Sequence, residues 1–225
     1  MNEHQNSHSL VSRFSTNLIR EIVGNEKDQG GIFMVDVNGF GNRCVFASLG
    51  RFVGPYHPLY CVDGCNGFDP FPFVTAARKE GRDPQAVLEN IFVSRVFTCH
   101  QMTAVVREEL PQIVDQPNTP LVAILGISDL FYDEALPFWE REYLYRRTLD
   151  HLKILRKKGL ITLVTFRDRQ EGSGARLWRW LLQHTADRVM RIENQWSVAS
   201  GQMSVVGGQY VQRRVASGRS DLLWG

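Results

Sequence analysis

The sequence predicts an α/β protein whose central sheet is mostly parallel and is flanked by helices on both faces, giving three layers. Short apolar runs alternate with helical patterns along most of the chain, an order typical of parallel strands joined by crossover helices. The run at 121–125 is apolar at every position, as expected for a strand covered on both faces. Near the end, alternating runs at 189–193, 202–206 and 209–214 predict antiparallel strands at the C-terminal edge of the sheet.

Length and composition limit the possible classes of protein. A chain of 225 residues is long enough for one domain with a substantial core. Its formal net charge of +2 neither favours nor excludes nucleic acid as a partner. No apolar run reaches the ~18 residues of a membrane span, and the first residues lack the apolar segment of a signal peptide. We therefore expect a cytoplasmic protein with no membrane contact.

The first part of the chain is predicted to be a separate helix. Residues 1–24 precede a single domain of residues 25–225, and the amphipathic pattern covers about 8–24. The apolar positions at helical spacing are Leu10, Phe14, Leu18 and Ile22. Such a helix packs either on its own domain or on a neighbouring subunit.

The remaining elements follow from apolar spacing and turn residues. The first half of the domain is predicted to contain strands at 32–35, 59–62 and 91–97 and helices at 45–52, 71–79 and 84–90. Asp83 suits the capping position of the third helix, and Pro84 suits its first turn. The second half is predicted to contain helices at 101–110, 139–155 and 175–185 and strands at 121–125 and 160–166.

The stretch from Leu59 to Gln101 resembles the ATPase core of RecA/RadA-type recombinases, most closely the RadA branch and its paralogues. The residues that match are Phe68, Pro70, Gly81, Val87–Ile91, Arg95, Phe97, His100 and Gln101. The resemblance implies a three-layer RecA-like domain with a nucleotide site at the carboxyl ends of its strands. It also implies that a segment ahead of the domain reaches a neighbouring subunit.

The family's phosphate loop aligns with the segment after the first strand. The loop consists of a glycine, any four residues, and then Gly-Lys-Ser or Gly-Lys-Thr. Its glycines wrap phosphate with backbone N–H groups, its lysine reaches the β and γ oxygens, and its hydroxyl binds Mg²⁺. Here the hydroxyl position is Cys44, a poor Mg²⁺ ligand, and the lysine position is Arg43. The candidate residues of this degenerate loop are Asn38, Gly39, Gly41, Asn42, Arg43 and Cys44. The alternative is a simple strand-to-helix turn.

Two further catalytic positions also lack the group that the resemblance implies. The family has a glutamate that prepares the attacking water two residues after the aspartate that aligns with Asp63, and this chain has Cys65 there. The family has an aspartate that holds Mg²⁺ at the position of Gly126. We therefore expect no catalytic residues, no metal and no cofactor. In the alternative, ATP and Mg²⁺ bind, Arg43 replaces the lysine, and Asp36, Asp63 or Asp129 holds the metal.

The four cysteines, Cys44, Cys61, Cys65 and Cys99, favour free thiols over a zinc site. A set of Cys61, Cys65, Cys99 and His100 has none of the usual spacings of structural zinc sites, and Cys61 falls in a predicted buried strand.

Four arginines are the candidate nucleic-acid contacts. Arg167 and Arg169 lie in a loop at the sheet edge, where the loops of recombinases touch DNA, and Arg176 and Arg179 lie in the next helix. Arginine interleaved with tryptophan grips phosphate and stacks on bases. The alternative is that Trp178 and Trp180 join the core stripe of that helix.

Together these observations predict a non-catalytic RecA/RadA-like accessory or assembly protein in DNA recombination or repair. The partners implied are single-stranded DNA and an active RecA-like ATPase or another repair subunit. The alternatives are an ATP-binding or ATP-hydrolysing protein with a non-standard phosphate loop, and a purely structural oligomerisation module.

Overall fold

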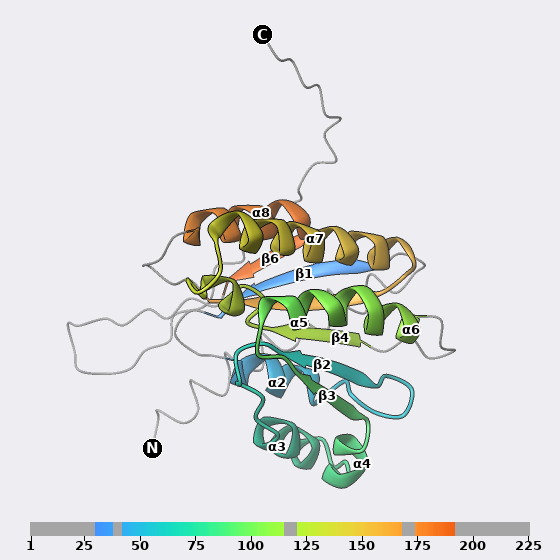
Figure 1. Ribbon diagram of the computed structural model, residues 1–225. Coiled ribbons are helices and arrows are strands. Elements are labelled where there is room, and N and C mark those ends of the chain that lie inside the picture. The colour runs from blue at the N-terminus through green and yellow to red at the C-terminus, as the bar shows by residue number, and fades with distance from the viewer. Residues whose placement is uncertain (1–29, 38–41, 115–120, 168–173, 192–225) are drawn as a thin grey trace, which may run out of the picture.

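The computed structural model describes residues 30–37, 42–114, 121–167 and 174–191 (Figure 1). Six strands form one sheet in the order β3-β2-β4-β5-β1-β6, and every neighbouring pair is parallel. In chain order the strands are β1 (Gly31–Asp36), β2 (Leu59–Asp63), β3 (Ile91–Arg95), β4 (Leu121–Leu125), β5 (Ile161–Phe166) and β6 (Arg188–Arg191). The predicted α/β class and parallel sheet are confirmed.

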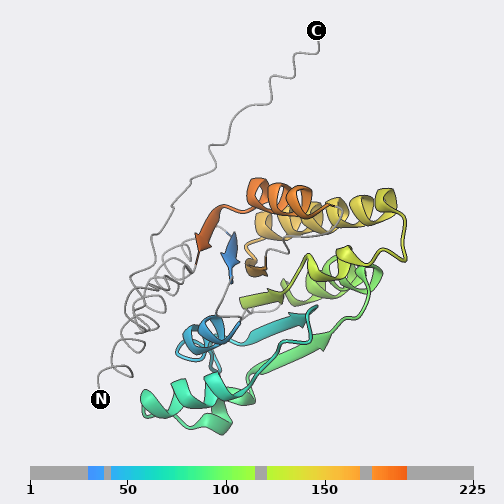
Figure 2. The ribbon, with the colours of Figure 1, turned by 90° about the vertical axis from the view of Figure 1, so that its left-hand side faces the viewer.

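Helices cover both faces of the sheet. One face carries α2 (Arg43–Leu49), α3 (Phe71–Lys79) and α4 (Pro84–Leu88). The other carries α5 (Cys99–Ala104), the π-helix η1 (Val105–Glu109), α6 (Leu110–Val114), the 3₁₀ helix η2 (Asp129–Tyr132), α7 (Phe138–Lys157) and α8 (Ala175–Thr185). The connections from β1 through β3 run one way across the sheet and later ones run back, so right-handed crossovers place the two sets on opposite faces. In Figures 1 and 2, α7 and α8 lie towards β1 and β6, and α3 and α4 towards β2 and β3.

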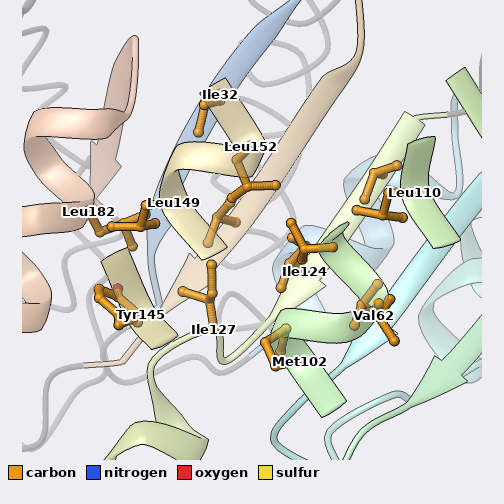
Figure 3. Packing of buried hydrophobic residues seen from close by; sticks show 14 of the residues in the cluster. Ile32, Val62, Met102, Leu110, Ile124, Ile127, Tyr145, Leu149, Leu152 and Leu182 are labelled. Carbon is orange, nitrogen blue, oxygen red and sulfur yellow. The ribbon is translucent and has the colours of Figure 1, made fainter. Parts of the chain in front are cut away.

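Two apolar clusters hold the layers together. Figure 3 shows the larger one, which contains Val62 and Ile124 of the sheet and Met102, Leu149 and Leu182 of the helices. The smaller cluster packs Phe33 and Leu163 of the sheet against Phe46 and Phe73. Each buried side chain of this size contributes about 1.5–3 kcal/mol, so the clusters stabilise the layered arrangement.

Two helix caps lie within the stretch that resembles the recombinases. Asp83 accepts hydrogen bonds from the backbone N–H groups of Gln85 and Ala86, as predicted, with Pro84 in the first turn. Thr98 caps α5 by accepting from the Gln101 N–H at 3.2 Å. The Gln101 side chain in turn accepts from the Phe97 N–H at 2.8 Å. These residues therefore have a structural function that requires no nucleotide.

The long helix predicted at 101–110 is divided into α5, η1 and α6. Pro111 stands at the start of α6 and lacks the N–H that an α-helix needs, while its ring would press on the carbonyl of Arg107. The wider π-turn at η1 ends next to this proline and relieves that contact.

The C-terminal edge differs from the prediction. The run at 189–193 is predicted as an antiparallel strand, whereas β6 pairs with β1 in parallel, with Met34 opposite Val189. The reason is that α8 crosses over the sheet and returns the chain to the starting edge, so the next strand runs in the same direction. The runs at 202–206 and 209–214 and the helix predicted within 1–24 lie outside the described residues. Within the described ranges, no helix is both long and apolar enough to cross a membrane.

Candidate functional site

The candidate site lies at the carboxyl edge of the sheet, where the segments after β1, β2, β4 and β5 begin. Ligands of open parallel sheets bind at this edge, where neighbouring strands send their connections to opposite faces. Here β2 and β4 are such neighbours, because β2 leads to α3 on one face and β4 leads to α7 on the other. The site is therefore built from loops whose positions are fixed by strands.

Asp63, the last residue of β2, organises the loop that follows it. Its buried carboxylate accepts from the backbone N–H groups of Gly67 at 2.9 Å, Phe68 at 3.1 Å and Cys65 at 3.3 Å. The guanidinium of Arg95 lies 3.8 Å away. The carboxylate is thus used to hold the turn from β2 to α3.

The predicted phosphate-loop residues are only partly described. Asn38, Gly39 and Gly41 lie outside the described residues. Asn42 is buried, and its amide nitrogen donates to the sulfur of Cys65 at 3.5 Å. Arg43 has a side chain that is 74% exposed and pairs with Asp69 at 3.6 Å. The arginine therefore points to the rim of the site.

The thiols at this edge are poor nucleophiles and poor metal ligands. Burial raises the pKa of Cys44, although the charge of Arg43 acts in the opposite direction. Burial also raises the pKa of Cys65 to about 11, with a smaller downward effect of the Asn42 hydrogen bond. Both side chains are neutral thiols at physiological pH, and thiolates rather than thiols attack substrates and bind metals.

Gly126 allows β4 and the loop after β2 to approach closely. Its φ of +59° falls in the left-handed region that favours glycine. A Cβ atom added here would lie 2.6 Å from the Cβ of Cys65 and 3.0 Å from a carboxylate oxygen of Asp129. The position where the resemblance implies an aspartate therefore has no room for a side chain.

A cleft of about 260 Å³ opens beside this contact. Its walls include Asp63, Cys65, Arg95, Phe97 and Asp129, from the ends of β2, β3 and β4. Among the described residues that line it are one cation and two carboxylates, so their charge is mixed.

The other two aspartates named for the ATP-binding alternative lie at this edge, where Asp36 ends β1 and Asp129 follows β4. Asp36 is buried and pairs with Arg179 at 3.1 Å. Asp129 follows Gly126 in a tight turn, where its N–H donates to the Gly126 carbonyl at 2.8 Å. Across the described ranges, no group of three or more His, Cys, Asp or Glu residues is placed to hold a metal ion. Metal binding by Asp36 would require its ion pair with Arg179 to be exchanged.

The predicted nucleic-acid residues occupy different environments. Arg167 and Arg176 are exposed, and Arg169 lies outside the described residues. Arg179 is largely buried, with its guanidinium on Asp36 and over the ring of Phe166. Of the three candidate arginines that the structure describes, two are therefore exposed near this edge, and the third closes the end of β1.

The two tryptophans of α8 also differ in their exposure to solvent. Trp178 is fully buried in the larger cluster, as the core alternative predicts, whereas Trp180 is exposed and contacts His184.

Sequence reasoning missed the contacts of Asp69 and Arg95. The only available signal was position, since Asp69 follows the matched Phe68 and Arg95 is itself a matched residue. Pairing between loops is set by the fold, which spacing alone does not specify.

The fold and this edge define a parallel, doubly wound α/β protein. Comparisons with protein-family models and with curated proteins find no match.

Proposed function

We propose that this protein is a non-catalytic RecA/RadA-like accessory or assembly protein in DNA recombination or repair. The observation that supports the proposal best is the contact among Asn42, Cys65 and Gly126. The resemblance assigns these positions to the phosphate loop, the general base and the metal aspartate. In this chain they pack directly on one another.

This packing removes the chemistry of nucleotide hydrolysis. Hydrolysis needs a metal ion on the phosphates and a group that orients the attacking water. The neutral thiol of Cys65 replaces a carboxylate, and Gly126 supplies no metal ligand. Loss of each such group typically lowers a rate by orders of magnitude.

The residues that cap the helices are consistent with a chain that keeps the fold without catalysis. Thr98 and Gln101 cap α5, and Asp83 caps α4, so their presence is explained by helix stability. The proposal includes the predicted antiparallel strands at 202–206 and 209–214, which could pair with β6, because β6 is the outermost strand of the sheet among the described residues.

The test is binding of a labelled single-stranded oligonucleotide by fluorescence anisotropy at several salt concentrations. We expect affinity to fall with salt, because bound phosphates release counterions. Arg167→Glu and Arg176→Glu should each weaken binding and reduce the salt slope by about 1. Arg78→Glu is the matched control, since Arg78 is exposed in the last turn of α3, away from the carboxyl edge.

An active RecA-like ATPase from the same cell supplies the second arm of the test. Addition of this protein should change the DNA-dependent ATP hydrolysis of that enzyme. Absence of salt-dependent DNA binding together with absence of any effect on the ATPase would refute the proposed function.

A further inference from the structure

Helix α8 carries a line of three exposed side chains, which we call the α8 stripe. The buried side of the helix contributes Trp178 and Leu182 to the larger cluster. The stripe consists of Arg176, Trp180 and His184, all of them exposed. They follow one another at steps of four residues, which makes them neighbours along one face of the helix. In Figure 1, α8 lies beside α7 in the outer layer of helices.

The aromatic ring in the middle of the stripe is held in a fixed position. The Nδ1–H of His184 donates to the backbone carbonyl of Trp180 at 2.7 Å, since a carbonyl oxygen can only accept. The imidazole packs on the indole with ring centroids 4.2 Å apart and an angle of 36° between the planes. Trp180 nevertheless remains 51% exposed. The indole therefore offers an ordered surface to a flat ring, and ordering before binding lowers the cost of association.

The helices that carry and adjoin the stripe are positively charged. Helix α8 contains two arginines and no Asp or Glu. Helix α7, which packs beside it, contains six Lys and Arg side chains against three Asp and Glu. Arg179 pairs with Asp36, whereas Arg176 forms no ion pair with any of the residues that the structure describes. The stripe thus combines an available cation with an exposed ring, and its surroundings favour an anionic ligand.

A protein partner would find little apolar surface on this helix. Trp180 is the only large apolar side chain of α8 that is exposed, because Trp178 and Leu182 are buried and Leu177 packs against the larger cluster. Protein interfaces have a desolvated apolar centre, which one ring between two basic side chains does not supply. A single strand of nucleic acid, by contrast, carries flat rings on a chain of phosphates, and proteins bind it with aromatic rings and cations together.

We propose that the α8 stripe is a stacking site for an unpaired base of single-stranded DNA. The base lies on the indole of Trp180, and Arg176, one helical turn before it, binds an adjoining phosphate. This inference rests on the proposed function and adds to it a residue that contacts the base itself. Every base has a π face, so the site has little sequence preference. It discriminates against duplex DNA, whose bases are stacked on one another inside the double helix.

The first test is fluorescence anisotropy of a labelled oligothymidylate at several salt concentrations. We expect Trp180→Ala to weaken binding about tenfold with an unchanged salt slope, because a stacked base is lost and no phosphate contact is. Trp180→Phe keeps a ring and should retain most of the affinity. Phe71→Ala is the matched control, since Phe71 is 72% exposed on α3, which covers the opposite face of the sheet. Its affinity should equal that of the unmodified chain.

The second test uses an oligonucleotide of the same length in which every base is absent. This strand keeps the phosphates, so the unmodified chain should bind it about tenfold less tightly than oligothymidylate. Trp180→Ala should cause no further loss with this strand. Equal losses for the two strands would overturn the stacking site, because the indole would then act without contacting a base. Binding of poly-glutamate that depends on Trp180 as strongly would also overturn it, because the stripe would then fit an acidic protein.

The two proposals fail in different ways. If the unmodified chain binds oligothymidylate with the expected salt dependence and Trp180→Ala binds equally well, the stacking site is refuted and the proposed function stands. If the unmodified chain shows no salt-dependent binding, the DNA-binding part of the proposed function fails, and the stacking site fails with it.

Discussion

Replacement of Asp63 by asparagine probes the loop on which the candidate site depends. The carboxylate accepts three backbone N–H groups, from Cys65, Gly67 and Phe68. An amide has one acceptor oxygen, so Asp63→Asn leaves at least one N–H without its partner and removes the charge opposite Arg95.

The expected cost follows from these contacts. A hydrogen bond to a charged group contributes about 1.5–3 kcal/mol, and the loss of charge also weakens the remaining bonds. We therefore expect Asp63→Asn to lower the free energy of unfolding by about 3 kcal/mol, a large share of the 5–15 kcal/mol of a typical domain. In urea denaturation, with an m value near ~3 kcal/mol/M, the midpoint should fall by roughly 1 M.

Asp69→Asn is the matched control for this substitution. Asp69 also accepts a backbone N–H, from Phe71 at 3.0 Å, but the contact is exposed and its partner Arg43 lies in solvent. We expect a cost below ~1 kcal/mol. Equal costs for the two substitutions would refute the conclusion that Asp63 is used to hold its loop.

Three further substitutions or reactions test the same edge. Gly126→Ala should destabilise the fold by several kcal/mol in urea denaturation, because its Cβ would strike Cys65; Gly81→Ala, which shares a positive φ but has open space, should cost about 1 kcal/mol. With the pKa of Cys65 raised to about 11, its alkylation at pH 8 should be roughly 100-fold slower than in the unfolded chain, as read by peptide mass spectrometry. Arg179→Ala should cost about 2–3 kcal/mol in thermal unfolding, because it removes the ion-pair partner of the buried Asp36.

Each of these expectations has a contradicting result. Equal costs for the two glycine substitutions would show that the loops separate readily. Rapid alkylation of Cys65 at pH 8 would show a more exposed thiol than the structure gives. An Arg179→Ala variant as stable as the unmodified chain would show that the ion pair contributes nothing.

The thiol of Cys65 also links stability to pH. Its folded-state pKa is the higher one, so the folded protein holds the proton more tightly than the unfolded chain. The resulting stability is fully present below the unfolded value of ~8.5 and is lost as pH rises towards the folded value. In Cys65→Ala, the free energy of unfolding should therefore fall less between pH 8 and pH 11 than it does in the unmodified chain.

The sequence predicts most of the framework because local signals and the fold agree there. The strand at 121–125 and the helices at 71–79 and 175–185 have the predicted bounds, since apolar spacing and turn residues mark their ends. The direction of β6 is predicted wrongly, because alternation of apolar residues marks a strand but does not give the direction of its partner.

The candidate site is less predictable than the framework. The losses at positions 65 and 126 are visible in the sequence, but their mutual contact depends on how β2 and β4 pair. The use of Asp63 by its own loop and of Asp36 by Arg179 depends likewise on tertiary geometry. Spacing along the chain identifies such residues as candidates and leaves their partners unspecified.

Calorimetric titration with ATP and Mg²⁺ tests the central claim most directly. The unmodified protein, Arg43→Ala and Arg78→Ala are compared at high protein concentration. The account predicts no binding heat for any of the three, because Arg43 points to the rim, Gly126 supplies no metal ligand, and the carboxylates of Asp36 and Asp63 are held by internal contacts. Saturable binding that Arg43→Ala abolishes and Arg78→Ala retains would contradict it and would make nucleotide binding the function of this edge.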